Sequence, residues 1–253
     1  MRITEKLMVK DQLVSFEVFP PKTDSAFDSI EWSVRELAAF NPDFMSVTYG
    51  AGGTGSKFTL PIAENIEKKY SVPVVHHLTC VGSSVENIKE RLDLMRAAGI
   101  ENVLALRGDM PEGEEPENWH FKHASDLVSY IKEYGDFCIG GACYPEGHPE
   151  AESMEKDLDF LKMKVDMGCD FLTTQLFLDN SVFLRHIDKG YFSAVIFDRF
   201  VDKFKNPLCA GNGHYYGVYL VRNVAYRLAE ASGKLEEGSD STEGESLPAL
   251  FPI

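Results

Sequence analysis

Strand-like and helix-like segments alternate along this chain with regularity up to about residue 188. The predicted strands cover residues 13–19, 44–49, 74–78, 102–106, 137–143 and 171–176. The predicted helices cover residues 25–40, 59–70, 83–98, 125–134, 153–167 and 181–188, and a capping box of Ser83 and Glu86 begins the third. Strands that alternate with helices form a parallel sheet with right-handed crossovers. The chain therefore folds into either a doubly wound open sheet or a (β/α)8 barrel.

The positions of polar residues decide between these two folds. Six successive predicted strands each carry a polar side chain at or just past the C-terminal end: Glu17, Thr48, His77, Asp109, Tyr144 and Gln175. In a barrel these ends meet at one mouth, where active sites are built, whereas an open sheet would spread them too far apart. We therefore predict an α/β fold of the (β/α)8 TIM-barrel type.

The last quarter of the chain departs from this pattern. Residues 191–197 fit a seventh strand, residues 199–205 a short helix and residues 214–231 a longer helix, but we recognise no eighth strand. We predict a single barrel domain over residues 1–232 that is incomplete or rearranged after the sixth β/α unit. Residues 233–253 are acidic and rich in small residues, which predicts a disordered tail.

Composition excludes several classes of protein. A net charge of −15 argues against nucleic acid or an anionic membrane as the main partner. The apolar runs are too short for a membrane span, and the N-terminal segment lacks the apolar region of a secretory signal. The five cysteines form no C-x-x-C pair and indicate free thiols in a reducing cytoplasm. His76 and His77 point to opposite faces of one strand, so we expect no metal site.

A lone carboxylate, Glu17, interrupts the first predicted strand. Alternation of side chains gives this strand a mixed face and an apolar face, which are Ser15, Glu17 and Phe19 against Val14, Phe16 and Val18. A carboxyl group is costly to bury unless it has a function. Burial also favours the protonated form, which suits a general acid near neutral pH. The alternative is an edge-strand glutamate that faces water.

A glycine-rich segment, residues 50–55, satisfies the G-x-G-x-x-G pattern of dinucleotide-binding folds. It follows the second strand rather than the first, and the next strand ends in residues 76–80 without an acidic residue for a ribose. A flexible loop at the mouth of a barrel explains the glycines as well.

Six segments together resemble one enzyme family closely. They are Ser15-Phe16-Glu17-Val18-Phe19-Pro20-Pro21-Lys22, Ser46-Val47-Thr48-Tyr49-Gly50-Ala51, His77-Leu78-Thr79-Cys80, Ala105-Leu106-Arg107-Gly108-Asp109, Tyr144-Pro145-Glu146-Gly147-His148-Pro149-Glu150 and Lys162-Met163-Lys164-Val165-Asp166-Met167-Gly168. In order and spacing over residues 13–180, they resemble the methylenetetrahydrofolate reductase family. Each segment is modest alone, but the set is highly specific.

The resemblance implies a cytoplasmic oxidoreductase of folate one-carbon metabolism and methionine biosynthesis. Such an enzyme reduces 5,10-methylenetetrahydrofolate to 5-methyltetrahydrofolate by a ping-pong mechanism, with non-covalent FAD as cofactor and NADH or NADPH as co-substrate. By this resemblance Glu17 is the general acid that protonates the folate N10, and Asp109 stabilises the cationic iminium. Thr48 and Gln175 match positions that contact the folate or the nicotinamide. Flavin-contacting positions match Tyr49, Ala51, His77, Arg107, Gly108, Asp109, Ala124, Tyr144, His148, Ala151, Asp157 and Lys164.

The similarity fades after about Asn180, where family members continue through two further β/α units. A barrel that lacks two strands exposes sheet edges. We therefore expect a rearranged end, a truncated product, or a C-terminal side covered by a second copy or a partner subunit. The alternative function is a non-catalytic relative that binds flavin or a partner without turnover. An unrelated lyase or aldolase would need a Schiff-base lysine or metal ligands at the strand ends, and the sequence offers neither.

Overall fold

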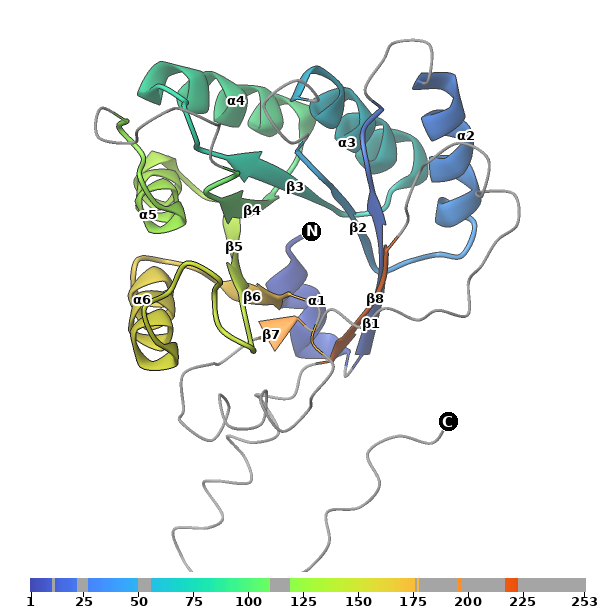
Figure 1. Cartoon of the computed structure of the whole chain (residues 1–253). Helices are drawn as coiled ribbons and strands as arrows, with labels where there is room; N and C mark the ends of the chain where they lie inside the picture. The colour runs from blue at the N-terminus through green and yellow to red at the C-terminus, as the bar shows by residue number, and fades with distance from the viewer. Residues whose placement is uncertain are drawn as a thin grey trace, which may run out of the picture.

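Six parallel strands, in the order of the chain, form the centre of the structure (Figure 1). They are β1 (Gln12–Val18), β2 (Phe44–Val47), β3 (Val74–Thr79), β4 (Asn102–Leu106), β5 (Cys138–Cys143) and β6 (Phe171–Thr174). The computed structural model describes residues 1–10, 12–21, 27–49, 56–109, 119–175, 177, 195–196 and 217–222. Each predicted strand is present, with ends shifted by no more than two residues. The parallel sheet confirms the β/α reading of the sequence.

A helix lies between each pair of successive strands and packs on the outer face of the curved sheet (Figure 1). These helices are α2 (Phe27–Ala38), α3 (Ser56–Tyr70), α4 (Val85–Ala98), α5 (Ala124–Tyr134) and α6 (Met154–Asp166). The largest hydrophobic cluster fills the layer between helices and sheet, and its members include Phe16 and Val18 of β1, Ile30 of α2, Ile66 of α3 and Leu92 of α4. In the described part of the chain, no helix has both the length and the apolar character needed to cross a membrane.

The end of the sheet differs from the sequence prediction. Strand β7 (Val195–Ile196) pairs in parallel with β6 and lies inside the predicted seventh strand. Strand β8 (Gly217–Arg222) pairs antiparallel with β1, so the predicted helix over residues 214–231 is wrong there and an eighth strand exists. The segment contains β-branched and aromatic residues, and pairing with β1 satisfies backbone groups that would otherwise form a sheet edge.

Strands β7 and β8 are the two ends of the sheet and lie close to each other. The sheet therefore curves into a TIM-type α/β barrel that is rearranged after its sixth unit, as the sequence predicted. The predicted helices over residues 181–188 and 199–205 and the predicted tail over residues 233–253 lie outside the described residues.

An additional helix, α1 (Ile3–Val9), was not predicted from the sequence and fills the amino-terminal end of the barrel. Its buried Ile3 and Leu7 join a second hydrophobic cluster formed by inward-facing strand residues, namely Leu13, Phe44, Val75, Leu104, Cys138 and Phe171. A barrel interior closed by a helix at one end can receive a ligand only from the other end, where the strands terminate.

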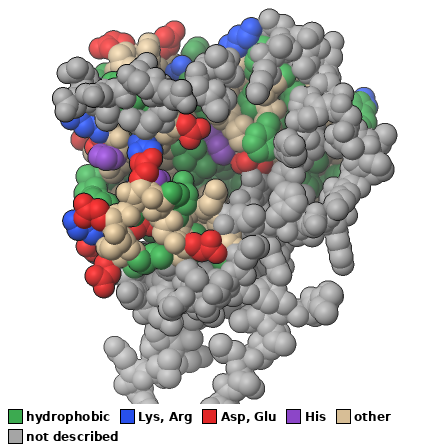
Figure 2. All heavy atoms as spheres, in the orientation of Figure 1, with side chains coloured by type: hydrophobic (Ala, Val, Ile, Leu, Met, Phe, Trp, Pro, Cys, Tyr) green, Lys and Arg blue, Asp and Glu red, His purple; other side chains and the backbone are tan. Residues whose placement is uncertain are grey.

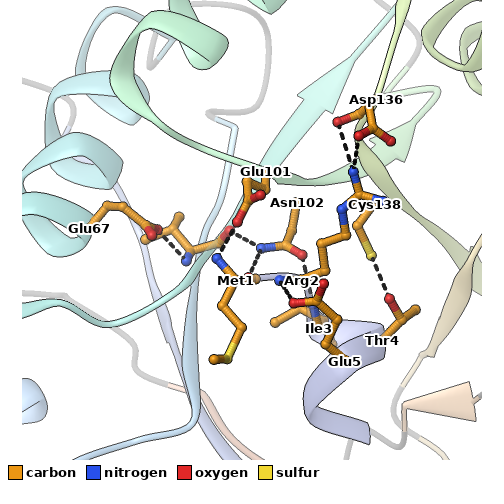
Figure 3. A network of polar contacts seen from close by, with 11 residues as sticks. Met1, Arg2, Ile3, Thr4, Glu5, Glu67, Glu101, Asn102, Asp136 and Cys138 are labelled. Carbon is orange, nitrogen blue, oxygen red and sulfur yellow. Dashed lines mark hydrogen bonds and ion pairs between the residues drawn. The ribbon is translucent and has the colours of Figure 1, made fainter. Parts of the chain in front are cut away.

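Asn102, the first residue of β4, ties α1 to the sheet (Figure 3). Its Oδ1 accepts a hydrogen bond from the backbone N of Ile3 at 2.8 Å, and its Nδ2 donates to the carbonyls of Met1 at 3.2 Å and Val74 at 3.1 Å. Both N–H groups and one lone pair of this buried amide side chain therefore bind backbone groups of β3, of α1 and of the residue that begins the N-terminal segment. Two ion pairs surround it, between the terminal ammonium of Met1 and Glu101 and between Arg2 and Asp136.

Candidate active site

A cavity of about 250 Å³ lies inside the barrel above α1. All six parallel strands contribute to its lining. Its apolar wall consists mainly of Phe44, Val75, Leu104, Leu106, Ala142 and Phe171, and its polar wall of Ser15, Glu17, Ser46, His77, Tyr144, Thr173, Thr174 and Gln175. Several of these polar residues stand at the carboxyl ends of their strands, as active-site residues of barrels do. The cavity is of a size that suits a small ring system rather than a whole dinucleotide.

Glu17 projects into this cavity from β1. Its side chain is 14% exposed, and the same Oε2 atom lies 2.9 Å from the Oγ of Ser46, which donates a hydrogen bond, and 3.5 Å from the Nε2 of His77. Strand β1 lies between β2 and β8, so the alternative of an edge-strand glutamate facing water is wrong. The opposite face packs on the helices through Phe16 and Val18 as predicted, but the prediction is wrong for Val14, which is 40% exposed.

The two histidines of β3 lie on opposite sides of the sheet, as alternation predicts. Burial lowers the pKa of His77, although the nearby Glu17 carboxylate opposes this shift. Burial lowers the pKa of His76 to about 3, and the neighbouring His77 contributes in the same direction. Both imidazoles are therefore neutral at pH 7. The Nδ1 atom of His76 finds no hydrogen-bond partner among the described residues.

A rim of charged and aromatic side chains surrounds the carboxyl ends of β4 and β5. Arg107 makes two hydrogen bonds to Glu150, at 2.7 and 2.8 Å, and this pairing raises the pKa of the guanidinium. The rings of Tyr144 and His148 meet edge to face with centroids 4.6 Å apart. In Figure 2, acidic, basic and histidine side chains lie side by side on the part of this face over α5 and α6.

Helix α6 contributes two charged residues to the same rim. The Oδ2 of Asp157 accepts a hydrogen bond from the backbone N of His148 at 3.1 Å. The Nζ of Lys164 donates to the carbonyl of Ala142 at 2.8 Å, and burial lowers the pKa of this lysine. Both side chains therefore turn toward the β5 loop, whereas Phe160 of the same helix is exposed.

The remaining predicted site residues lie at several depths. Gln175 lines the cavity, and its backbone N donates to the carbonyl of Cys143 at 2.7 Å. Thr48 follows β2, half-buried, with its backbone N bonded to the carbonyl of Val18 at 3.0 Å. Asp109 is exposed just beyond β4 and does not line the cavity. The structure thus brings Gln175 together with Glu17, and leaves Asp109 at the rim.

Four further predicted residues have mainly backbone or loop roles in this structure. The guanidinium carbon Cζ of Arg91 lies over the ring of Tyr49, 4.8 Å from the centroid of the ring. Gly108 has φ +94°, and an added Cβ would lie 2.8 Å from Val81 Cγ1, so this turn needs glycine. Ala124 begins α5, and the N of Ala151 donates to the carbonyl of His148 at 3.0 Å. Ala51 lies outside the described residues.

Sequence reasoning missed the roles of Ser46 and Glu150. Ser46 is the strand partner of Glu17 in the register between β1 and β2, so its hydroxyl reaches the carboxylate. Alternation within residues 44–49 places Ser46 and Thr48 on one face, which was the available signal. Glu150 gave no such signal, because its pairing with Arg107 joins two loops that are 43 residues apart.

A family model described as methylenetetrahydrofolate reductase matches residues 2–196. The chain belongs to this family. Methylenetetrahydrofolate reductase (NADH) 1 of Arabidopsis thaliana is 40% identical over 188 residues, which are 69% of this chain and 32% of the plant protein. The 5,10-methylenetetrahydrofolate reductase of Pectobacterium carotovorum subsp. carotovorum is 41% identical over 177 residues, which are 70% of this chain and 58% of the bacterial protein. The chain thus spans less than two thirds of the length of these relatives.

Solved structures support the fold of this methylenetetrahydrofolate reductase relative. A 2,3-dimethylmalate lyase superimposes with a TM-score of 0.56 at 11% identity, covering 79% of this chain and 70% of the other. An uncharacterised Clostridium thermocellum protein that binds two copies of 5-methyl-5,6,7,8-tetrahydrofolic acid has a TM-score of 0.53 at 13% identity, covering 77% and 68%. At such identities the likeness concerns the fold alone. The family resemblance and the barrel predicted from the sequence are both confirmed.

Proposed function

We propose that this chain reduces 5,10-methylenetetrahydrofolate to 5-methyltetrahydrofolate, with FAD as cofactor and a reduced nicotinamide as electron donor. The observation that carries the proposal is the position of Glu17: a carboxyl group at the mouth end of a barrel interior, in a segment that matches the family. Two relatives carry this activity in their names, and the plant relative's name specifies NADH. The choice between NADH and NADPH is a separate measurement.

The residues at the mouth fit a flavin dinucleotide. A flat ring needs aromatic and apolar surface, which Tyr144 and the cavity wall supply. Phosphates need cations, and Arg107 and Lys164 lie on the same rim. Ribose hydroxyls need acceptors such as Asp157. Arg107 is bonded to Glu150 in this structure, so an anion that binds this guanidinium must displace or share that carboxylate.

The chain's own residues have distinct tasks in this proposal. FAD, when bound, supplies the capacity to take hydride from the nicotinamide and deliver it to the folate. Glu17 holds a proton for the folate N10 as the five-membered ring opens, and the Asp109 carboxylate at the rim favours the cationic iminium that results. Thr48 and Gln175 orient the folate or the nicotinamide. Because α1 fills the opposite end, both substrates approach from the strand ends and bind in turn, as a ping-pong mechanism requires.

A second candidate is a non-catalytic relative that binds flavin or a partner without turnover. The observation that favours it is the antiparallel β8, which stands beside β1 at the end of the sheet. Flavin retention without folate reduction is the result that separates this candidate from the enzyme.

We also propose a cytoplasmic location and an assembly in which a second copy or a partner subunit covers the C-terminal side. The departure of the described sheet from the β/α pattern after β6 motivates the assembly. Light scattering of the purified chain gives its mass in solution. A monomeric mass with full activity would contradict the need for a covering subunit.

The decisive experiment is a visible spectrum of the purified full chain, supplied with FAD and kept anaerobic. A flavin spectrum that bleaches on addition of NADH or NADPH and returns on addition of methylenetetrahydrofolate supports the reductase. Bleaching without return supports the non-catalytic candidate. A protein that binds no flavin when FAD is supplied contradicts both flavin-dependent readings.

A further inference from the structure

Among the described residues, the hydroxyl of Ser46 makes the only hydrogen bond to the carboxyl group of Glu17. The donor Oγ lies 2.9 Å from Oε2, and the two residues are directly paired in the register between β1 and β2. Ser46 is 6% exposed, so this contact lies inside the barrel wall rather than in bulk water. The imidazole of His77 approaches the same Oε2 atom at 3.5 Å. Both neighbours therefore occupy one oxygen of the carboxyl group.

This asymmetry distinguishes the two carboxyl oxygens chemically. The carbonyl oxygen of a carboxylic acid is a better hydrogen-bond acceptor than its hydroxyl oxygen, so a Ser46 hydroxyl that donates to Oε2 favours the acid proton of Glu17 on Oε1. Fixing Oε2 against Ser46 also limits rotation of the carboxyl group, which otherwise exchanges the two oxygens. A general acid works only when its proton is within hydrogen-bond reach of the acceptor in the substrate.

We propose that Ser46 is a positioning residue for Glu17, and that it makes Oε1 the oxygen that releases the proton. This inference rests on the proposed function. In the step that it serves, the O–H bond at Oε1 breaks and its proton joins the folate N10. That nitrogen receives the electron pair of the breaking C–N bond, and the negative charge remains on the carboxylate of Glu17. The Ser46 hydroxyl donates to Oε2 before and after the transfer.

The test is a set of variants assayed in the two half-reactions separately. Ser46→Ala should slow the folate half-reaction about tenfold, because a misplaced acid loses reactive geometry while the remaining contacts to folate persist. The KM for folate and the nicotinamide half-reaction should stay within about twofold. Ser46→Thr keeps the hydroxyl and should restore most of the rate. Ser33→Ala is the matched control, since Ser33 of α2 is 7% exposed and lies outside the cavity lining.

Combining Ser46→Ala with Glu17→Gln separates positioning from a structural effect. If Ser46 acts through Glu17, its removal should cost nothing further once the acid is gone, so the two losses are not additive. A second tenfold loss in the Glu17→Gln background would overturn the proposal, as would a failure of Ser46→Thr to restore the rate.

If the wild-type chain reduces no folate, the proposed function is contradicted. The contact between Ser46 and Glu17 can then still be tested by measuring stability. Single and double variants Ser46→Ala and Glu17→Ala are then compared in denaturant titrations. If the hydrogen bond is present, the double variant should change the unfolding equilibrium constant about fivefold less than the product of the two single-variant effects. Additive effects would show that the contact does not hold Glu17, and the positioning role would be rejected.

Discussion

Glu17 lines the barrel cavity beside the hydroxyl of Ser46 and the neutral imidazole of His77. Replacing its carboxyl group by an amide preserves the shape of the side chain but removes the acidic proton. Glu17→Gln should therefore leave flavin binding and nicotinamide oxidation intact while slowing the folate half-reaction by about a hundredfold or more. Stopped-flow spectra of each half-reaction measure this. Glu64→Gln on α3 is the control, since Glu64 is exposed and paired with Lys68. An undiminished folate rate in Glu17→Gln would refute the assigned role.

His76 makes stability depend on pH in a defined direction. Its pKa is about 3 in the folded chain and about 6.5 when unfolded, so below pH 6.5 only the unfolded chain gains this proton. The neutral His76 imidazole makes its full contribution to the free energy of unfolding above pH 6.5. This contribution is lost as the pH falls toward 3, by about 1.4 kcal/mol per pH unit. Denaturant titrations at pH 7, 6 and 5 should show this loss. His76→Gln should show a shallower slope, and an equal slope would contradict the buried neutral imidazole.

At the scale of single residues, the sequence indicated the inward-facing Glu17 but not its hydrogen-bond partner Ser46. Alternation alone placed Glu17 and His77 on the inner face, because a two-residue period follows from strand geometry. The contact from Ser46 depends on register between strands, which is set by packing of the whole sheet. The Arg107–Glu150 pair depends on how two loops meet, which local sequence does not encode.

At the scale of elements, the first residues of α4 show which side chain caps the helix. The predicted capping box of Ser83 and Glu86 is wrong by one residue, because Ser84 is the N-cap and its Oγ accepts from the backbone N of Asn87 at 3.2 Å. Ser84→Ala should lower the free energy of unfolding by about 1 kcal/mol, whereas Ser83→Ala should change it by less than about half of that. Urea titrations measure both variants. Equal effects would contradict the observed cap.

Helix α1 depends on one buried amide. Asn102→Ala would leave the N–H of Ile3 and the carbonyl of Val74 without their described partner, and each buried polar group without a partner costs about 1–3 kcal/mol. We expect a loss of about 3 kcal/mol in the free energy of unfolding, measured by denaturant titration. Asn87→Ala, at an exposed position of α4, is the control. A loss below about 1 kcal/mol would show that other contacts hold α1.

Periodicity identified the long elements of the barrel and failed at its two ends. The six central strands and five helices have clear periods and were found. Helix α1 has only seven residues, too few for a periodic pattern to stand out. Residues 217–222 carry apolar side chains at spacings that also fit a helix, and only the adjacent β1 edge selects the strand.

For the whole molecule, β8 determines whether β1 is an inner or an outer strand. Neighbouring residues of a strand direct their backbone N–H groups to opposite sides of the strand. Of the two variants Val218→Pro and Tyr219→Pro, one therefore removes an N–H group that faces β1. That variant should lose about 3 kcal/mol or more of stability and self-associate through the uncovered edge. Thermal melts and light scattering measure both effects. Val218→Ala keeps the N–H and is the control; if both proline variants remain monomeric and stable, β8 does not protect β1.

The contacts of α1 also determine how long this helix stays unburied during synthesis. Ile3 bonds to Asn102, 99 residues further along, and Thr4 contacts Cys138, 134 residues further along. A ribosome adds about 5–20 residues per second, so the apolar side chains of α1 wait on the order of ten seconds for the strands that bury them. During that interval the nascent chain presents Ile3 and Leu7 to chaperones or to other nascent chains. Helix α1 is therefore made well before the strands that bury it.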